Sequence, residues 1–160
     1  MPLHLHSSAG AGRYFDVAGV HPGALIPVLV DPAMLKTCFV FIHGSWPYAG
    51  ELTAMLDKPN VYLDFSGQSY LLYPRALSQE IRAWLEYVPE KVMFGTDASP
   101  VTDQIGWEET GWMSAVSGRE ALGMALTAML QDNEITRERA AKLARMAMRE
   151  NAARLYGFKQ

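Results

Sequence analysis

The stretch Cys38-Phe-Val-Phe-Ile-His43 decides the fold class, because it is a short and nearly continuous run of aromatic and β-branched residues. A run of this kind is typical of a strand that is covered on both faces, as strands of parallel sheets are. Three comparable runs extend from Leu3 to His6, from Val61 to Ser66 and from Lys91 to Asp97. Amphipathic helical segments separate the runs, most clearly at residues 77–87. This alternation predicts an α/β fold of four βα units around a parallel sheet.

The last third of the chain predicts helices and no further strand. One helix is expected over about residues 118–130. A second begins at Thr136, whose hydroxyl suits a helix N-cap, and continues past Met148. Residues 106–112, which are rich in Trp, Gly and Glu, are expected to form a loop before these helices. No repeat or second domain is visible, so we expect one domain over residues 1–160.

Composition excludes several classes of protein. The chain has 14 Lys and Arg against 17 Asp and Glu, a net charge of -3 and no basic stripe, so no nucleic-acid partner is expected. With 49% hydrophobic residues it can bury a sizeable core. Cys38 is the single cysteine, and no stretch fits a membrane span or a signal peptide. We therefore expect a soluble, cytoplasmic protein that binds no membrane.

Chemically capable side chains end three of the predicted strands: His6, His43 and Asp97. The carboxyl ends of parallel strands meet at one edge of the sheet, where ligands bind in α/β folds. Two neutral imidazoles and a carboxylate suit Zn²⁺ or another first-row divalent ion. Taken alone, a histidine is more often a surface or hydrogen-bonded residue, and His21, in a loop before a proline, is given that interpretation.

Other side chains near the same edge are weaker candidates. Asp64, Ser66 and Trp46 could line the mouth of the site, and Trp107 and Trp112 could cap it. Packing is the more ordinary role for each of these five residues. The methionines of the C-terminal helices are expected to fill the core or an interface, because Met adapts to irregular gaps.

Five segments spread over nearly the whole chain form a distinctive series. They are Pro2-Leu-His-Leu-His6-Ser-Ser, Phe41-Ile-His43-Gly-Ser-Trp-Pro, Asn60-Val-Tyr-Leu-Asp-Phe-Ser, Val92-Met-Phe-Gly-Thr-Asp97-Ala-Ser-Pro and Glu150-Asn-Ala-Ala-Arg-Leu-Tyr-Gly. In order and content the series resembles the amidohydrolase superfamily, in its amidohydrolase-related branch. That branch contains metal-dependent hydrolases and non-oxidative decarboxylases.

The resemblance implies roles for the three residues at the strand ends. His6 matches the histidine that ends strand five of the family's (β/α)₈ barrel, a metal ligand. His43 matches the histidine that ends strand six, a second ligand or an acid–base group. Asp97 matches the aspartate that ends strand eight, a ligand or proton-transfer group. The expected cofactor is a divalent metal ion, with zinc first and manganese or iron as alternatives.

The chain departs from the family pattern in length. A complete barrel takes about 250 residues, so the four βα units would be equivalent to strands five to eight, a half-barrel followed by C-terminal helices. The family's strand-one His-x-His pair and its strand-four ligand would be missing. His4-Leu5-His6 could itself be the strand-one pair, but the order His, His-Gly, Gly-Thr-Asp favours strand five. His4 would then be hydrogen-bonded in the core.

A half-barrel would leave two outer strands unpaired and expose apolar residues such as Phe39, Phe41 and Met93 on its concave face. We therefore expect a homo-oligomer or a complementing barrel half as partner. The expected function is metal-dependent hydrolysis or non-oxidative decarboxylation of a small carboxylic or cyclic substrate. The alternative is a catalytically inactive truncated fragment or an oligomerising interaction module.

A third interpretation is a small flavodoxin-like binding domain. The Gly-rich stretch Ala9-Gly10-Ala11-Gly12 follows a predicted strand, as a phosphate-binding loop would. It lacks the Lys-Ser/Thr ending and the clear helix of such loops, which argues against this interpretation.

Overall fold

The structure is a computed structural model that describes residues 1–8 and 16–158. Four strands form one sheet in the order β1-β2-β3-β4, and every neighbouring pair is parallel. Their bounds are β1 Leu3–Leu5, β2 Phe39–Phe41, β3 Val61–Asp64 and β4 Val92–Met93. The predicted α/β fold with a parallel sheet is confirmed, although each strand ends one to four residues earlier than predicted. The Gly-rich stretch at residues 9–12 lies outside the described residues.

Helices and helical turns make every connection. Between β1 and β2 lie η1 Ala18–Val20, η2 Pro22–Leu25 and α1 Ile26–Leu29, and between β2 and β3 lie η3 Ile42–Ser45 and α2 Ala49–Met55. Between β3 and β4 lie α3 Gln68–Leu71, α4 Pro74–Tyr87 and η4 Pro89–Lys91. After β4 come α5 Trp107–Gln131, α6 Arg137–Arg145, the π-helical η5 Met146–Glu150 and α7 Asn151–Tyr156.

The register places alternate strand residues on opposite faces of the sheet. Leu5, Phe41 and Leu63 lie side by side on one face, and one buried cluster joins this face to α2, α4 and α5. The apolar stripe of α4 is fully part of this cluster, through Leu77, Ile81, Trp84 and Leu85. Burial of these side chains on the helix side of the sheet is the main source of the stability of the fold.

The expected exposure of Phe39, Phe41 and Met93 is wrong. The exposed fractions of Phe39 and Phe41 are 1% and 0%, because the register turns both toward the helices. Met93 lies on the other face beside Asp64, and its exposed fraction is 3%. The segment η5 packs beside β4, and the Phe94 backbone N–H donates to the Ala147 carbonyl at 2.8 Å.

The expected loop at residues 106–112 is also wrong, because α5 begins at Trp107. Two acidic residues, Glu108 and Glu109, lie in its first turn, where the helix dipole favours negative charge. The Glu109 carboxylate also accepts from the Gly106 backbone N–H at 2.8 Å. The predicted N-cap of α6 is confirmed, since the Thr136 hydroxyl accepts from the Arg139 backbone N–H at 3.2 Å.

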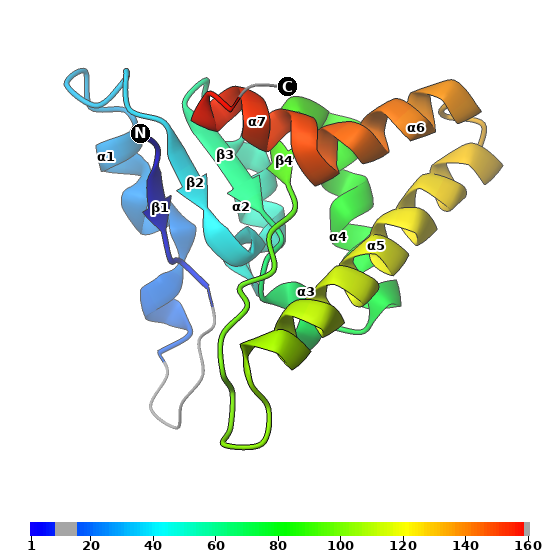
Figure 1. Cartoon of the computed structure of the whole chain (residues 1–160). Helices are drawn as coiled ribbons and strands as arrows, with labels where there is room; N and C mark the ends of the chain where they lie inside the picture. Colours follow the sequence, from blue (N-terminus) through cyan, green and yellow to red (C-terminus); the bar gives the residue numbers. More distant parts are fainter. Residues whose placement is uncertain (9–15, 159–160) are drawn as a thin grey trace.

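The last helix, α7, lies at the amino ends of the strands (Figure 1) and is hydrogen-bonded to both edges of the sheet. Asn151, which is buried, donates through Nδ2 to the carbonyls of Pro89 and Val92 at 2.7 and 2.8 Å. His4 Nε2 and the Tyr156 hydroxyl are 2.6 Å apart, so β1 is tied to α7. His4 is hydrogen-bonded as expected, but it is exposed and does not lie in the core.

Within the described residues, no helix combines the length and the apolar character that crossing a bilayer requires.

Candidate active site

The turn that follows β2 holds His43 in an unusual backbone conformation. His43, Gly44 and Ser45 all have positive φ, at 60°, 54° and 53°. Residues other than glycine rarely adopt this left-handed region, and where they do the surrounding contacts must hold them there. Two such contacts flank His43: its backbone N–H donates to Asp64 Oδ1 at 3.3 Å, and its carbonyl accepts from Gln68 Nε2 at 2.7 Å.

The His43 ring is held through its Nδ1 atom. This atom lies 3.0 Å from the Ser66 carbonyl oxygen and 3.0 Å from Ser66 Oγ. The Ser66 hydroxyl donates its own proton to Asp64 Oδ1, so the carbonyl is the acceptor that an Nδ1 proton needs. The tautomer that fits this network carries the proton on Nδ1 and leaves the Nε2 lone pair free. A histidine held in this way is suited to bind a metal ion or to take up a proton.

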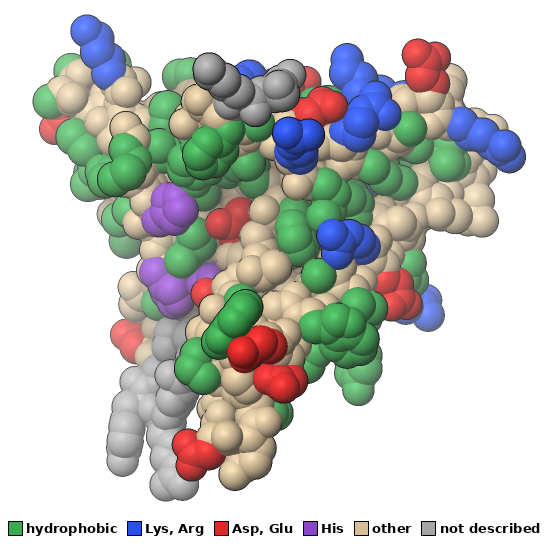
Figure 2. Space-filling view, viewed as in Figure 1, with side chains coloured by type: hydrophobic (Ala, Val, Ile, Leu, Met, Phe, Trp, Pro, Cys, Tyr) green, Lys and Arg blue, Asp and Glu red, His purple; other side chains and the backbone are tan. Residues whose placement is uncertain are grey.

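The free side of His43 faces the two other predicted residues. His43 Nε2 and Asp97 Oδ2 are 4.0 Å apart, and the His6 and His43 rings meet edge to face with centroids 4.9 Å apart. The side chain of His43 is 10% exposed and that of Asp97 is 40% exposed, so this corner opens to solvent. Figure 2 shows histidine side chains at the surface on the side of the molecule where β1 and β2 lie.

Asp97 is oriented by a tyrosine of α3, the helix that follows β3. The Tyr70 hydroxyl donates to Asp97 Oδ2 at 2.8 Å. Burial raises the pKa of Tyr70 to about 12, helped by the hydrogen bond to Asp97 and by its negative charge. Tyr70 therefore keeps its proton and stays a donor at any physiological pH. Asp97 itself has a φ of 53°, again in the left-handed region.

The donor types at this corner fit a divalent metal ion, but the set is partial. Neutral imidazole nitrogen and carboxylate oxygen are common ligands of zinc, manganese and iron. Within residues 1–8 and 16–158, no three His, Cys, Asp or Glu side chains are placed together so as to hold an ion. The three predicted residues therefore lie at one corner without forming a closed ligand cluster.

Two of the weaker candidates support the His43 turn. Asp64 accepts from the backbone N–H groups of His43 and Ser66 and from the Ser66 hydroxyl, and it links the ends of β2 and β3. Trp107 and Trp112 are 60% and 68% exposed on the first turns of α5. That they cap the site stays a prediction, as does a role for the half-buried Trp46.

His21 has the ordinary role expected of a loop histidine. Its Nδ1 accepts from the Gly23 backbone N–H at 3.1 Å and caps η2, and its ring packs edge-on against Tyr48.

Three residues of the site were missed by the sequence analysis: Gly67, Gln68 and Tyr70. Gly67 has a φ of 67°, and a Cβ there would lie 2.7 Å from His43 Nδ1 and 3.3 Å from Asp97 Oδ2. A glycine directly after a predicted strand signals a close approach of the backbone to another group, and this signal was available in the sequence. No comparable signal pointed to Gln68 or Tyr70.

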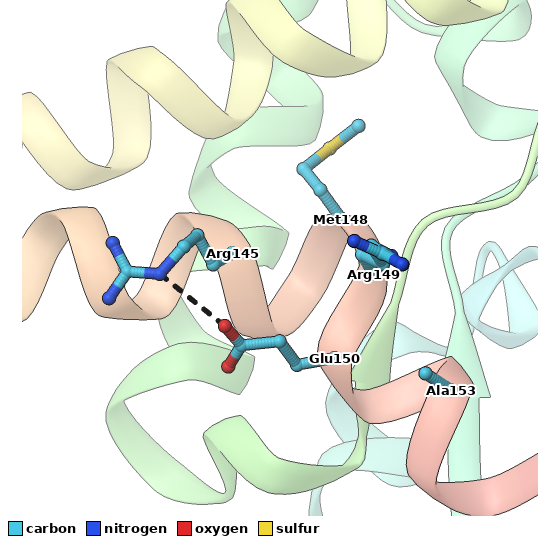
Figure 3. Close-up of a pocket in the computed structure, with 5 residues that line it drawn as sticks. All are labelled: Arg145, Met148, Arg149, Glu150 and Ala153. Atoms are coloured by element: carbon cyan, nitrogen blue, oxygen red, sulfur yellow. Dashed lines mark ion pairs between the residues drawn. The ribbon is translucent and has the colours of Figure 1, made fainter. Parts of the chain in front are cut away.

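A separate pocket of about 320 Å³ lies on the C-terminal helices (Figure 3). Its lining residues are Arg145, Met148, Arg149, Glu150 and Ala153. An ion pair of 3.4 Å joins Arg145 and Glu150 across it. None of His6, His43 and Asp97 lines this pocket, so it is not part of the corner described above.

Comparison with known proteins places the chain in a family. The sequence profile described as amidohydrolase matches residues 2–158, so the chain belongs to the amidohydrolase family. A solved structure with the same fold comes from Lactobacillus casei ATCC 334, a protein whose assignment as a metal-dependent hydrolase is itself an inference. The TM-score is 0.75 at 22% identity, over 98% of this chain and 39% of that one. Among curated proteins, no sequence matches this chain.

Proposed function

We propose that this chain supplies the acid–base residue and part of the metal-binding set of a metal-dependent amidohydrolase. One observation carries the proposal: His43 is anchored through Nδ1 while its Nε2 faces Asp97 and its ring faces His6. A divalent ion in such a site polarises a substrate carbonyl or activates water, which is the chemistry that hydrolysis needs.

Each of the three residues has a distinct role in this proposal. His6 and Asp97 are the metal ligands, and zinc is the first candidate ion, with manganese and iron as alternatives. His43 moves a proton through Nε2, because Nδ1 is occupied by the Ser66 carbonyl. Tyr70 orients Asp97 by donating a hydrogen bond to the oxygen that faces His43.

The rest of the ligand set would come from residues other than these 160. In the proposal, β1 to β4 correspond to strands five to eight of an eight-stranded barrel, and the chain spans 39% of the length of its structural neighbour. A second copy or a complementing barrel half would supply the other strands and ligands. The substrate would be a small carboxylic or cyclic compound, hydrolysed or decarboxylated in the cytoplasm.

The proposal is tested by the metal content of protein purified without added metal. Elemental mass spectrometry is expected to find near-stoichiometric metal in the wild type and in His21→Ala, whose histidine lies outside the site. His6→Ala and Asp97→Ala are expected to lose the metal. Turnover of cyclic and carboxylic substrates with added Zn²⁺ or Mn²⁺ should fall in the same two variants. Turnover that persists in both would overturn the assignment of ligands.

One further variant decides whether β1 corresponds to strand five or to strand one of the family's barrel. If His6 ends strand five, His4→Ala is expected to keep the metal, because the His4 ring is hydrogen-bonded to the Tyr156 hydroxyl of α7. If His4-Leu5-His6 is the strand-one pair, His4→Ala and His6→Ala lose the metal equally.

The second candidate function is a non-catalytic oligomerising module. It is favoured by the distances between the candidate ligands. His43 Nε2 and Asp97 Oδ2 are 4.0 Å apart, and among the described residues no third His, Cys, Asp or Glu side chain is placed with them so as to hold an ion. The same measurements decide between the two. A wild type without metal or turnover, and with a stable self-association in analytical ultracentrifugation, would support the module.

A further inference from the structure

His6 is the candidate site residue whose ring has the fewest fixed contacts. His43 is held through Nδ1 by the Ser66 carbonyl. Asp97 accepts a hydrogen bond from the Tyr70 hydroxyl. The exposed His6 ring meets the His43 ring edge to face, but it forms no hydrogen bond among the described residues. Its position relative to His43 therefore depends on what holds the backbone around it.

The strand ladder does not extend to the two histidines. The pairing of β1 with β2 ends at Leu5 and Phe41, before either histidine is reached. Beyond this point β2 turns into η3, while the chain after β1 continues without helix or strand as far as Ser8. A contact other than the ladder is therefore needed to keep the two strand ends together.

A pair of buried serines supplies that contact. Ser7 and Ser45 are 4% and 0% exposed, and their Oγ atoms are 2.7 Å apart. Because both are buried, loss of this hydrogen bond would leave a hydroxyl without a partner, which is costly. Ser7 directly follows His6, and Ser45 is the second residue after His43. The bond therefore joins the backbone beside one imidazole to the backbone beside the other.

Ser45 is the fixed member of the pair. It belongs to the left-handed turn, with a φ of 53°, and its carbonyl accepts from the Tyr48 backbone N–H at 2.7 Å. Two residues earlier, the His43 carbonyl accepts from the Trp46 backbone N–H at 3.0 Å. Ser7, by contrast, lies outside any helix or strand. The bond to Ser45 therefore determines where Ser7 and the histidine before it lie.

We propose that the hydroxyl pair of Ser7 and Ser45 positions His6 against His43, which makes both serines positioning residues of the candidate site. The inference rests on the proposed function in treating the two histidines as members of one site. It concerns the distance between the two rings, whose centroids are 4.9 Å apart, and not the identity of the ion. Support of this kind matters for His6, because a metal site requires its ligands to be held in place by the residues around them.

The test is the nuclear Overhauser effect between the ring protons of His6 and His43, measured by NMR at one pH without metal or substrate. The wild type is expected to show the effect, because the two rings are in contact. Ser7→Ala and Ser45→Ala should each reduce it several-fold and move the His6 ring signals toward those of an unfolded peptide. The double variant should do no more than either single variant, since all three lack the same hydrogen bond. The Nδ1 signal of His43 should remain that of a hydrogen-bonded nitrogen, because the Ser66 carbonyl still holds it.

Two further variants make the outcome specific. Ser78→Ala removes another buried hydroxyl, which donates to the Arg75 carbonyl at 2.8 Å, and should leave the effect unchanged. In a double variant with Ser7→Cys and Ser45→Cys, a disulfide should preserve the effect, and its reduction to two weakly bonding thiols should abolish it. Absence of the effect in the wild type, its persistence in both alanine variants or its loss in Ser78→Ala would overturn the inference. A wild type that shows the effect but binds no metal would contradict the proposed function alone.

Discussion

At the scale of single residues, the position of the His43 ring depends on the absence of a side chain at Gly67. In Gly67→Ala the new Cβ would lie 2.7 Å from His43 Nδ1, in a backbone conformation that alanine adopts at a cost. We expect the ring to be displaced, the bound metal to fall at least about tenfold, and the His43 ring signals to move in NMR spectra. Elemental analysis of purified protein measures the loss.

Gly123→Ala is the matched control for this substitution. A Cβ at Gly123 meets nothing within 4 Å in the interior of α5, so alanine should stabilise the helix by about 0.5–1 kcal/mol. Its metal content should equal that of the wild type. If Gly67→Ala bound as much metal as the wild type, the His43 ring would tolerate the Cβ, and the turn would be more flexible than its contacts indicate.

A second prediction at this scale concerns the hydroxyl of Tyr70. Tyr70→Phe removes the donor to Asp97 Oδ2 but keeps the ring, so Asp97 is free to rotate away from His43. Metal affinity should fall about 10- to 100-fold, as it does when a residue that hydrogen-bonds to a metal ligand is removed, with little change in stability. Isothermal titration with Zn²⁺ measures it. Tyr73→Phe, at a tyrosine that is 87% exposed, should bind as the wild type does.

The sequence could predict the proximity of His6, His43 and Asp97, because the ends of parallel strands meet at one edge. It could not predict the contacts of Gln68 and Tyr70. Those contacts depend on how α3 turns after β3, and that turn depends on the positive φ of Gly67 and the packing of α3 against α5. Pattern and spacing do not contain this information.

At the scale of elements, the start of α6 depends on one hydroxyl. Thr136→Ala removes the acceptor of the Arg139 backbone N–H, and we expect the free energy of unfolding to fall by about 1 kcal/mol. Urea denaturation followed by circular dichroism measures it. Thr136→Ser keeps the oxygen and should lose much less. If the two variants unfold alike, the cap contributes nothing and the packing of α6 alone holds it.

A larger loss of stability is expected where hydrogen bonds join α7 to β4. Asn151 places its Nδ2 between the Pro89 and Val92 carbonyls, and Asn151→Asp would put a carboxylate oxygen there instead of two N–H donors. The loss should be about 2–4 kcal/mol at pH 7, since a buried charge would face two carbonyl oxygens. Asn133→Asp, at an exposed residue in a left-handed turn, should cost little. A small loss in Asn151→Asp would contradict the role of this side chain as the fastening point of α7.

The elements that sequence patterns predicted well are those whose own residues determine them. The four strands and α4 follow from local periodicity, and α6 follows from its cap. The start of α5 was predicted as a loop because Gly106, Gly111 and the tryptophans are typical of loops. In the structure Gly111 lies within α5, and a Cβ on it would make a tight contact of 3.3 Å with the Ala98 Cβ. A small residue is therefore favoured at this position by a contact from outside the helix, which local patterns do not contain.

At the scale of the whole molecule, the sheet has one face joined to the helical core and two edges, β1 and β4, that pair with no further strand among the described residues. The C-terminal segment η5–α7 packs beside β4 and reaches β1 through Tyr156. The His4–Tyr156 contact thus ties β1 to α7, close to the two ends of the family match.

The stability of the fold is expected to depend on pH through Glu80, a half-buried residue of α4. Its pKa is raised from 4.5 to about 7 in the folded protein, so the native state binds more protons than the unfolded chain between these values. The buried, protonated carboxyl contributes fully below about pH 4.5, and its contribution is lost as pH rises through 7. From pH 5 to pH 8 the wild type should therefore lose on the order of 1–3 kcal/mol relative to Glu80→Gln. Urea unfolding of wild type, Glu80→Gln and Glu51→Gln, which changes an exposed glutamate of α2, measures this difference at both pH values, with a chelator present to remove metal. Parallel behaviour of the wild type and Glu80→Gln would mean that Glu80 is ionised in the folded protein at both pH values, which would contradict the raised pKa.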